Sequence, residues 1–258
     1  MLLRSKMLSQ TWMKALLLPV PVIGFLLLWE FASRSFGVPQ LFPDPKTTGQ
    51  TFLELLRSGV LLSDAEVSLA RIAAGFMLGS VIGIGLGLLC TVSWVAASLL
   101  SPYINFLRFI SGVAWISIFM VWFGIGETSK IVLIAYTVAF TVALSAFAGL
   151  SEIKLAHLRA AAMFGATPRQ VFIGVRIPTL IRSVITGMRL SLGNAFLVIV
   201  AAEMVQADSG LGFSIIAARN FLAPDIIFAV MLVIGLLGFL ADRGFVALSR
   251  SMLNRYSR

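Results

Sequence analysis

Few residues in this sequence could perform chemistry, and none is arranged as a catalytic site. The segment most like a phosphate-binding loop is 124–130, which reads Gly-Ile-Gly-Glu-Thr-Ser-Lys and lacks the glycine that precedes lysine in that motif. Neither a His-Glu-x-x-His zinc motif nor a Gly-x-Ser-x-Gly nucleophile turn occurs in the sequence. The sequence therefore predicts no catalytic residue, no metal site and no cofactor bound by this chain.

The remaining reactive side chains stand alone. His157 is the single histidine and Cys90 the single cysteine, so neither a metal cluster nor an intrachain disulfide can form from them. We expect His157 to be a solvated or interface side chain.

The composition points to lipid. Of the 258 residues, 59% are hydrophobic and 12% are charged, with a mean hydropathy of +0.99. A soluble domain carries roughly 25% charged residues, so a soluble globular fold is excluded. The net charge of +9 then fits cytoplasmic segments of a membrane protein better than nucleic-acid binding, which we do not expect.

Six apolar stretches are long enough to cross a bilayer. They predict an all-α, polytopic membrane protein in which residues 1–258 form one transmembrane domain. The first stretch has no small-residue cleavage site, so we interpret it as a retained span and not as a signal peptide. The predicted spans lie near 15–33, 66–91, 99–122, 129–150, 184–204 and 225–248.

Positive charge predicts the orientation of these spans. With the N-terminus inside, twelve Lys and Arg residues lie on inner segments and four on outer ones. Both termini and the loop 151–183 are therefore predicted to be cytoplasmic, whereas 34–65 and 205–223 face the other side.

Small residues recur in the second span. Gly75, Gly79, Gly83 and Gly87 follow one another every four residues. Such a ladder lets a second helix backbone approach closely in lipid. The alternative is that glycine is simply common in membrane helices. The sequence leaves open whether the partner helix belongs to the same chain or to a second copy.

The loop 151–183 predicts a helix, a tight turn and a second helix. Helix-favouring residues run to Phe164, and Gly165 suits a left-handed helix stop. Thr167, Pro168 and Gln170 then supply an N-cap, a first-turn proline and a capping box. We expect the second helix to end at Ile177, where Pro178 forces a bend. Such a knob suits docking into another protein, although an amphipathic connector lying on the bilayer is an alternative.

Polar residues inside spans are candidates for a pore or gate. Asn105 and Arg108 interrupt the third span, where Arg108 either helps an anion through the pore or forms a structural pair. Glu203 ends the fifth span and is followed by Gly210 and Gly212. That segment is either a gate or docking lip, or an ordinary solvated loop. Asn194 is expected to form an interhelical hydrogen bond.

The loop also resembles a known family. Its spacing is similar to the Glu-Ala-Ala motif of binding-protein-dependent ABC importer permeases. The positions that correspond to the motif are Arg159, where the family usually has glutamate, and Ala160, Ala161, Gly165, Ile177 and Pro178. Further segments resemble the branch that serves nitrate, taurine, alkanesulfonates and bicarbonate: 41–45, 68–72, 122–126 and 202–213.

The resemblance implies a type I ABC importer permease in a bacterial inner membrane. Two copies would form the pore, two cytoplasmic ATPase subunits would carry ATP and Mg²⁺, and an external solute-binding protein would deliver a small anion. The helix 155–164 would be the coupling helix that enters each ATPase. Two alternatives to an ABC importer permease are an ion-coupled secondary carrier that works without an ATPase and a structural scaffold. The chain itself is not expected to be an enzyme.

Overall fold

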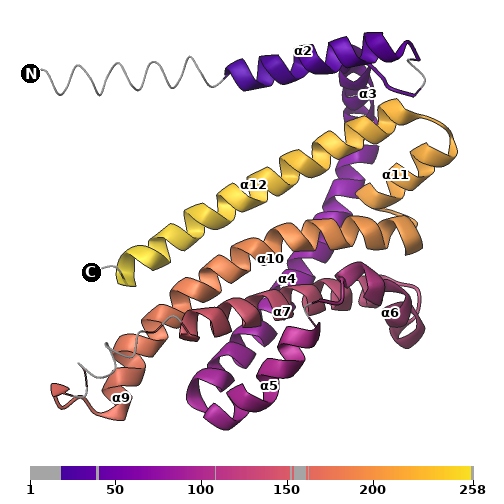
Figure 1. The fold of residues 1–258 in the computed structure, drawn as a ribbon. Helices are drawn as coiled ribbons and strands as arrows, with labels where there is room; N and C mark the ends of the chain where they lie inside the picture. Colours follow the sequence, from indigo (N-terminus) through magenta and orange to yellow (C-terminus); the bar gives the residue numbers. More distant parts are fainter. Residues whose placement is uncertain are drawn as a thin grey trace, which may run out of the picture. The chain divides into compact units, whose positions relative to one another are not determined.

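The computed structural model describes residues 19–38, 41–107, 109–151, 153, 161 and 163–256 (Figure 1). The described residues are mainly helical and contain no β-strand. The elements are α2 (Pro19–Phe36), α3 (Pro45–Arg57), α4 (Val60–Val92), α5 (Trp94–Leu107), the 3₁₀ turn η1 (Gly112–Trp115), α6 (Ile116–Phe123), α7 (Glu127–Ser151), α9 (Pro168–Val171), the π turn η2 (Phe172–Arg176), α10 (Ile177–Gln206), α11 (Leu211–Asn220) and α12 (Pro224–Tyr256).

Four described helices are long and apolar enough to cross a membrane. They cover Val60–Val92, Glu127–Gly149, Pro168–Val205 and Pro224–Arg250, and they contain four of the predicted spans to within one residue. The span predicted at 15–33 begins outside the described residues, and α2 is not one of the four. These observations confirm an all-α polytopic membrane protein.

The stretch predicted as the third span, 99–122, is not one straight helix. This stretch holds α5, then η1 and α6, with an 89° bend between the two parts, so that together they count as at most one broken span. The break has a local cause at Ser111, whose hydroxyl oxygen accepts a hydrogen bond from the Val113 N–H at 3.3 Å and so starts a new turn.

Contacts divide the described chain into two compact units. The first comprises the described part of Met1–Leu61 with Ile215–Met231. Within it, the Trp29 indole donates to the Pro43 carbonyl at 3.0 Å, and Thr51 donates to Asp225 at 2.8 Å. Asp44 caps α3, and hydrogen bonds from Thr47 lower the pKa of the Asp44 carboxyl below its ordinary value.

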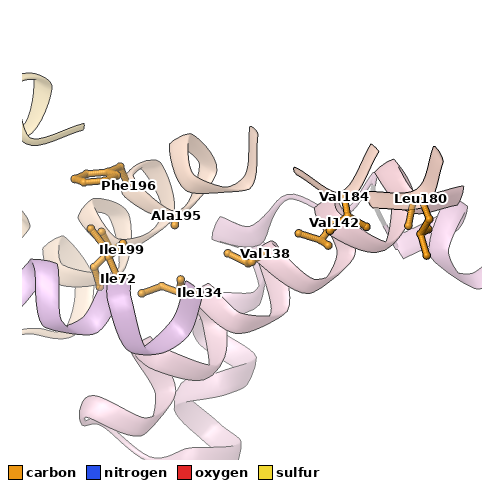
Figure 2. Close-up of a cluster of buried hydrophobic side chains, with 10 residues drawn as sticks. Ile72, Ile134, Val138, Val142, Leu180, Val184, Ala195, Phe196 and Ile199 are labelled. Atoms are coloured by element: carbon orange, nitrogen blue, oxygen red, sulfur yellow. The ribbon is translucent and has the colours of Figure 1, made fainter. Parts of the chain in front are cut away.

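The second unit is Leu62–Ser214 with Leu232–Arg258, and its core lies between α7 and α10, which run alongside each other (Figure 1). Ile134, Val138 and Val142 recur every four residues on α7, so they share one face, and all three are fully buried. Figure 2 shows them with Ile72 of α4 and Ile199 of α10 in one cluster of buried side chains.

The glycine ladder of α4 packs against α7 of the same chain. A Cβ atom at Gly75 would lie 2.5 Å from the Cβ of Ile134, and one at Gly79 would lie 2.5 Å from the Ala135 carbonyl oxygen. A Cβ at Gly83 would similarly lie 2.7 Å from the Ala139 carbonyl oxygen. Close packing is therefore confirmed, and the partner helix within the described structure is an internal one.

The predicted helix end at Ile177 is wrong. The helix that begins at Pro168 continues to Val205, and a π turn at Phe172–Arg176 lies just before Pro178 and accommodates it within the helix. Within it, the Ile177 N–H donates to the Phe172 carbonyl, five residues earlier. Pro178 falls in the first turn of α10, where its missing N–H is tolerated, so the chain does not have to leave the helix.

Candidate functional site

A buried ion pair joins α4 to α10 near one end of the second unit. Arg71 is 4% exposed and Glu203 is fully buried, and Arg71 Nη1 lies 2.7 Å from Glu203 Oε1. The Ser68 hydroxyl, one turn before Arg71, lies 2.8 and 2.9 Å from the two Glu203 oxygens. Charged groups this deep are stable only when paired and hydrogen-bonded, which both are here.

The other edge of the Arg71 guanidinium binds Glu127 of α7. Its Nε and Nη2 atoms each lie 2.6 Å from a Glu127 carboxylate oxygen, which is a two-point contact. Lys130 contributes a further ion pair to Glu127 at 3.0 Å. Arg71 Nη1 also donates to the Ser209 carbonyl at 2.8 Å. The charges of Arg71 and Lys130 therefore offset those of Glu127 and Glu203.

The same cluster caps the N-terminus of α11. The Gly212 N–H donates to Glu203 at 2.9 Å, and the Leu211 N–H donates to Ser68 at 3.0 Å. The Gly210 N–H donates to Asp64 at 3.0 Å, and the Asp64 carboxylate also accepts from the Ser214 hydroxyl. Carboxylates are favourable at this position because the helix dipole places positive potential there.

Gly210 and Gly212 permit this close approach. Gly210 has φ +113°, a conformation that residues with a Cβ rarely adopt, and a Cβ there would lie 2.5 Å from Glu203 Oε1. A Cβ at Gly212 would lie 2.7 Å from the Glu203 Cβ. We call Asp64, Ser68, Arg71, Glu127, Lys130 and Glu203, with the Ser209–Gly212 backbone, the ion network.

The ion network shows where three sequence-predicted gate residues lie. Glu203, Gly210 and Gly212 come together, and the alternative of acids sitting in water does not describe the buried Glu203. No role was predicted from the sequence for Asp64, Ser68, Arg71 or Glu127. A signal was present, because positions 64, 68 and 71 share one helix face. The role of these residues as a gate stays a prediction.

Other candidates lie apart from the ion network. Asn105 is exposed on α5, and its amide donates to the Ser101 carbonyl at 2.9 Å, within its own helix. Arg108, His157, Arg159 and Ala160 lie outside the described residues.

The opposite end of the second unit carries the turn that precedes α10. The Ala166 N–H donates to the Ala161 carbonyl at 3.0 Å across Gly165, whose φ is +72°. This pairing and the left-handed glycine form a helix C-cap, as the sequence predicted. Met163 and Phe164, just before the glycine, are 88% and 91% exposed.

The next helix starts as predicted. The Thr167 N–H donates to Gln170 Oε1 at 2.7 Å, and the Gln170 N–H donates to the Thr167 hydroxyl at 3.4 Å, so the capping box is complete. We call residues 161 and 163–176 the lever. At its base Arg176 donates to the Thr91 carbonyl of α4 at 3.0 Å, next to Ile177 and Pro178.

Four long apolar helices define a multi-pass membrane protein. Residues 79–254 match the family described as binding-protein-dependent transport system inner membrane component, and the chain belongs to this family. It is thus a transport protein of the inner membrane and not an enzyme, and nothing favours the secondary-carrier alternative.

Two relatives and a solved structure agree with this family assignment. The chain is 33% identical to the taurine transport system permease protein of Escherichia coli (strain K12), over 87% of this chain and 83% of the relative. It is 34% identical to a putative aliphatic sulfonates transport permease protein of Bacillus subtilis (strain 168), over 94% and 87%. Its fold matches a methionine ABC transporter in an inward-facing conformation with a TM-score of 0.56, at 22% identity, over 74% of this chain and 97% of that one.

Proposed function

We propose that this permease imports a small anion of the sulfonate class, driven by ATP that a separate subunit hydrolyses. Relatives named for taurine and for aliphatic sulfonates support this cargo. The segment 124–130, which lacks the glycine of a phosphate loop, supports placing ATP and Mg²⁺ on another chain.

The proposed assembly has two permease copies, two ATPase subunits and a solute-binding protein. Both termini and the lever face the cytoplasm in this proposal, in keeping with the distribution of Lys and Arg. The ion network then lies near the outer face, where the binding protein releases its cargo. ATP draws the two ATPase subunits together, the levers move with them, and the bundle turns from inward-open to outward-open.

The observation that carries the proposal is the exposure of Met163 and Phe164 on a capped turn that lies between two candidate spans. Large apolar side chains exposed outside the spans are not explained by lipid contact and are typical of surfaces that bind another protein. The turn is fixed on both sides, by the left-handed Gly165 and by the capping box at Thr167. A segment fixed in this way can transmit a push to α10, with which it is continuous.

Proteoliposomes containing the whole complex test this function. With the binding protein and taurine on one side and ATP on the ATPase side, we expect accumulation of taurine that stops with a non-hydrolysable ATP analogue. Dissipating ion gradients with ionophores should leave the rate unchanged. Accumulation driven by an ion gradient without ATP would contradict the proposal and favour the secondary carrier.

A further inference from the structure

A cavity of about 480 Å³ lies in the second unit, between the bend that joins α5 to α6 and the middle of α7 and α10. Its volume falls within the range of small-molecule sites, which is about 300–1,000 Å³. No member of the ion network lines this cavity, so the two features are separate. Its depth, near Thr141 of α7 and Asn194 of α10, is about midway along both helices.

Asn194 brings an unsatisfied amide to this cavity. The side chain is half-buried and lines the cavity, and no hydrogen bond to it is found among the described residues. The interhelical hydrogen bond expected from the sequence is therefore not observed there. An amide that leaves water without a partner costs free energy, so such groups in spans usually serve a ligand or a partner.

Two hydroxyl groups add further donors. The Tyr136 hydroxyl is buried beside the indole N–H of its ring neighbour Trp115, which can only donate to the Tyr136 oxygen, so the O–H of Tyr136 remains available to donate. Ser111 accepts the Val113 N–H at 3.3 Å through its oxygen, which leaves its own O–H available to donate. Both Tyr136 and Ser111 line the cavity.

The remaining lining limits what the cavity can hold. Phe140, Leu197 and Val198 supply apolar wall, and no charged side chain lines the cavity within the described part of the chain. Neutral donors beside an apolar wall suit an oxyanion that carries a short apolar body. Neutral donors hold an anion less tightly than a charged clamp would, and a conducting site must also release its ligand.

We propose that this cavity is a transit site, at which the permease itself holds a small sulfonate-class anion by the Asn194 amide and the Ser111 and Tyr136 hydroxyls. The transit site rests on the proposed function, because it supplies the cargo class. It adds a selectivity step within the membrane, after release from the binding protein.

The test compares transport by variants of the whole complex in proteoliposomes, with saturating binding protein and with taurine as the probe. Asn194→Leu removes the amide at similar volume, and Tyr136→Phe and Ser111→Ala remove one oxygen each. Thr186→Val is the matched control, since Thr186 is also on α10, is exposed, and donates to the Arg182 carbonyl outside this cavity.

We expect Asn194→Leu to lower taurine transport roughly tenfold, as for a lost hydrogen bond to a charged group, with basal ATP hydrolysis and assembly unchanged. Tyr136→Phe and Ser111→Ala should each lower taurine transport severalfold. If Asn194→Leu does not assemble, these two variants test the transit site. Wild-type rates in the assembled variants would overturn the transit site alone. A wild-type complex that moves no sulfonate would instead overturn the proposed function, and the transit site with it.

Discussion

Arg71 and Glu203 lie 132 positions apart in the sequence and form a buried ion pair, with 2.7 Å between Nη1 and Oε1. The same Glu203 carboxylate caps the start of α11, and the same Arg71 guanidinium grips Glu127 of α7. One pair of charges therefore ties four helices together at one end of the second unit.

Breaking this pair on one side should be costly. Arg71→Met leaves Glu203 buried without its cation, and we expect the free energy of unfolding to fall by about 3–5 kcal/mol. Thermal unfolding in detergent measures it, and faster alkylation of the buried Cys90 provides a second readout.

An exposed pair in the same chain supplies the control. Arg189 bonds Asp242 with the same two-point geometry, but the two side chains are 54% and 34% exposed. Arg189→Met should lower the free energy of unfolding far less than Arg71→Met does, because solvent screens the exposed pair. Equal losses in the free energy of unfolding for Arg71→Met and Arg189→Met would show that burial of the ion network adds nothing to stability.

The glycine ladder gives a prediction with an internal control. Gly79→Ala places a methyl group 2.5 Å from the Ala135 carbonyl oxygen, so α4 and α7 must separate, at about 1–3 kcal/mol. Gly85→Ala, on the same helix, meets nothing within 4 Å and should be neutral or slightly stabilising. Melting temperatures of the purified variants test the difference, and a Gly79→Ala protein as stable as the wild type would argue against tight packing.

The left-handed turn of the lever should be needed for coupling. Gly165 has φ +72° and open space around it, so a substitution acts through the backbone alone. Gly165→Val should strain the turn by about 1–2 kcal/mol, whereas asparagine tolerates this conformation. We expect Gly165→Val to keep ATP hydrolysis while taurine uptake falls roughly tenfold, and Gly165→Asn to retain most uptake. Similar uptake by both variants would count against a fixed turn.

Arg176 should anchor the lever to α4. It donates to the Thr91 carbonyl near the C-terminal end of that helix, a favourable place for a cation. Arg176→Gln should weaken this tie by about 1–2 kcal/mol and raise the ATP consumed per taurine imported. Arg176→Lys, which keeps the charge, should be intermediate. An unchanged ratio in Arg176→Gln would remove the anchoring role.

Local features of this fold are readable from the sequence because residues a few positions apart decide them. The stop at Gly165 and the capping box at Thr167 are examples, as is the four-residue glycine spacing of α4. The resemblance to the permease family likewise rests on short motifs with fixed spacing, and the family match confirms it.

The rest depends on contacts that one sequence does not reveal. Nothing local says that Arg71 meets Glu203, because the folding of several helices brings them together. Pro178 suggested a helix end, but the π turn before it satisfied the backbone in another way. The sharpness of the break near Ser111 could not be predicted, because the residues around it are as apolar as a continuous span. The roles of Arg108, Arg159 and Ala160 remain predictions.

In the proposed function the lever contacts an ATPase subunit, and a photo-crosslinking residue in place of Phe164 tests this contact most directly. In the membrane-embedded complex we predict that light joins this position to the ATPase, whereas the same residue at the exposed Phe239 of α12 does not. Adducts from position 164 that contain only lipid, or only the solute-binding protein, would contradict the account.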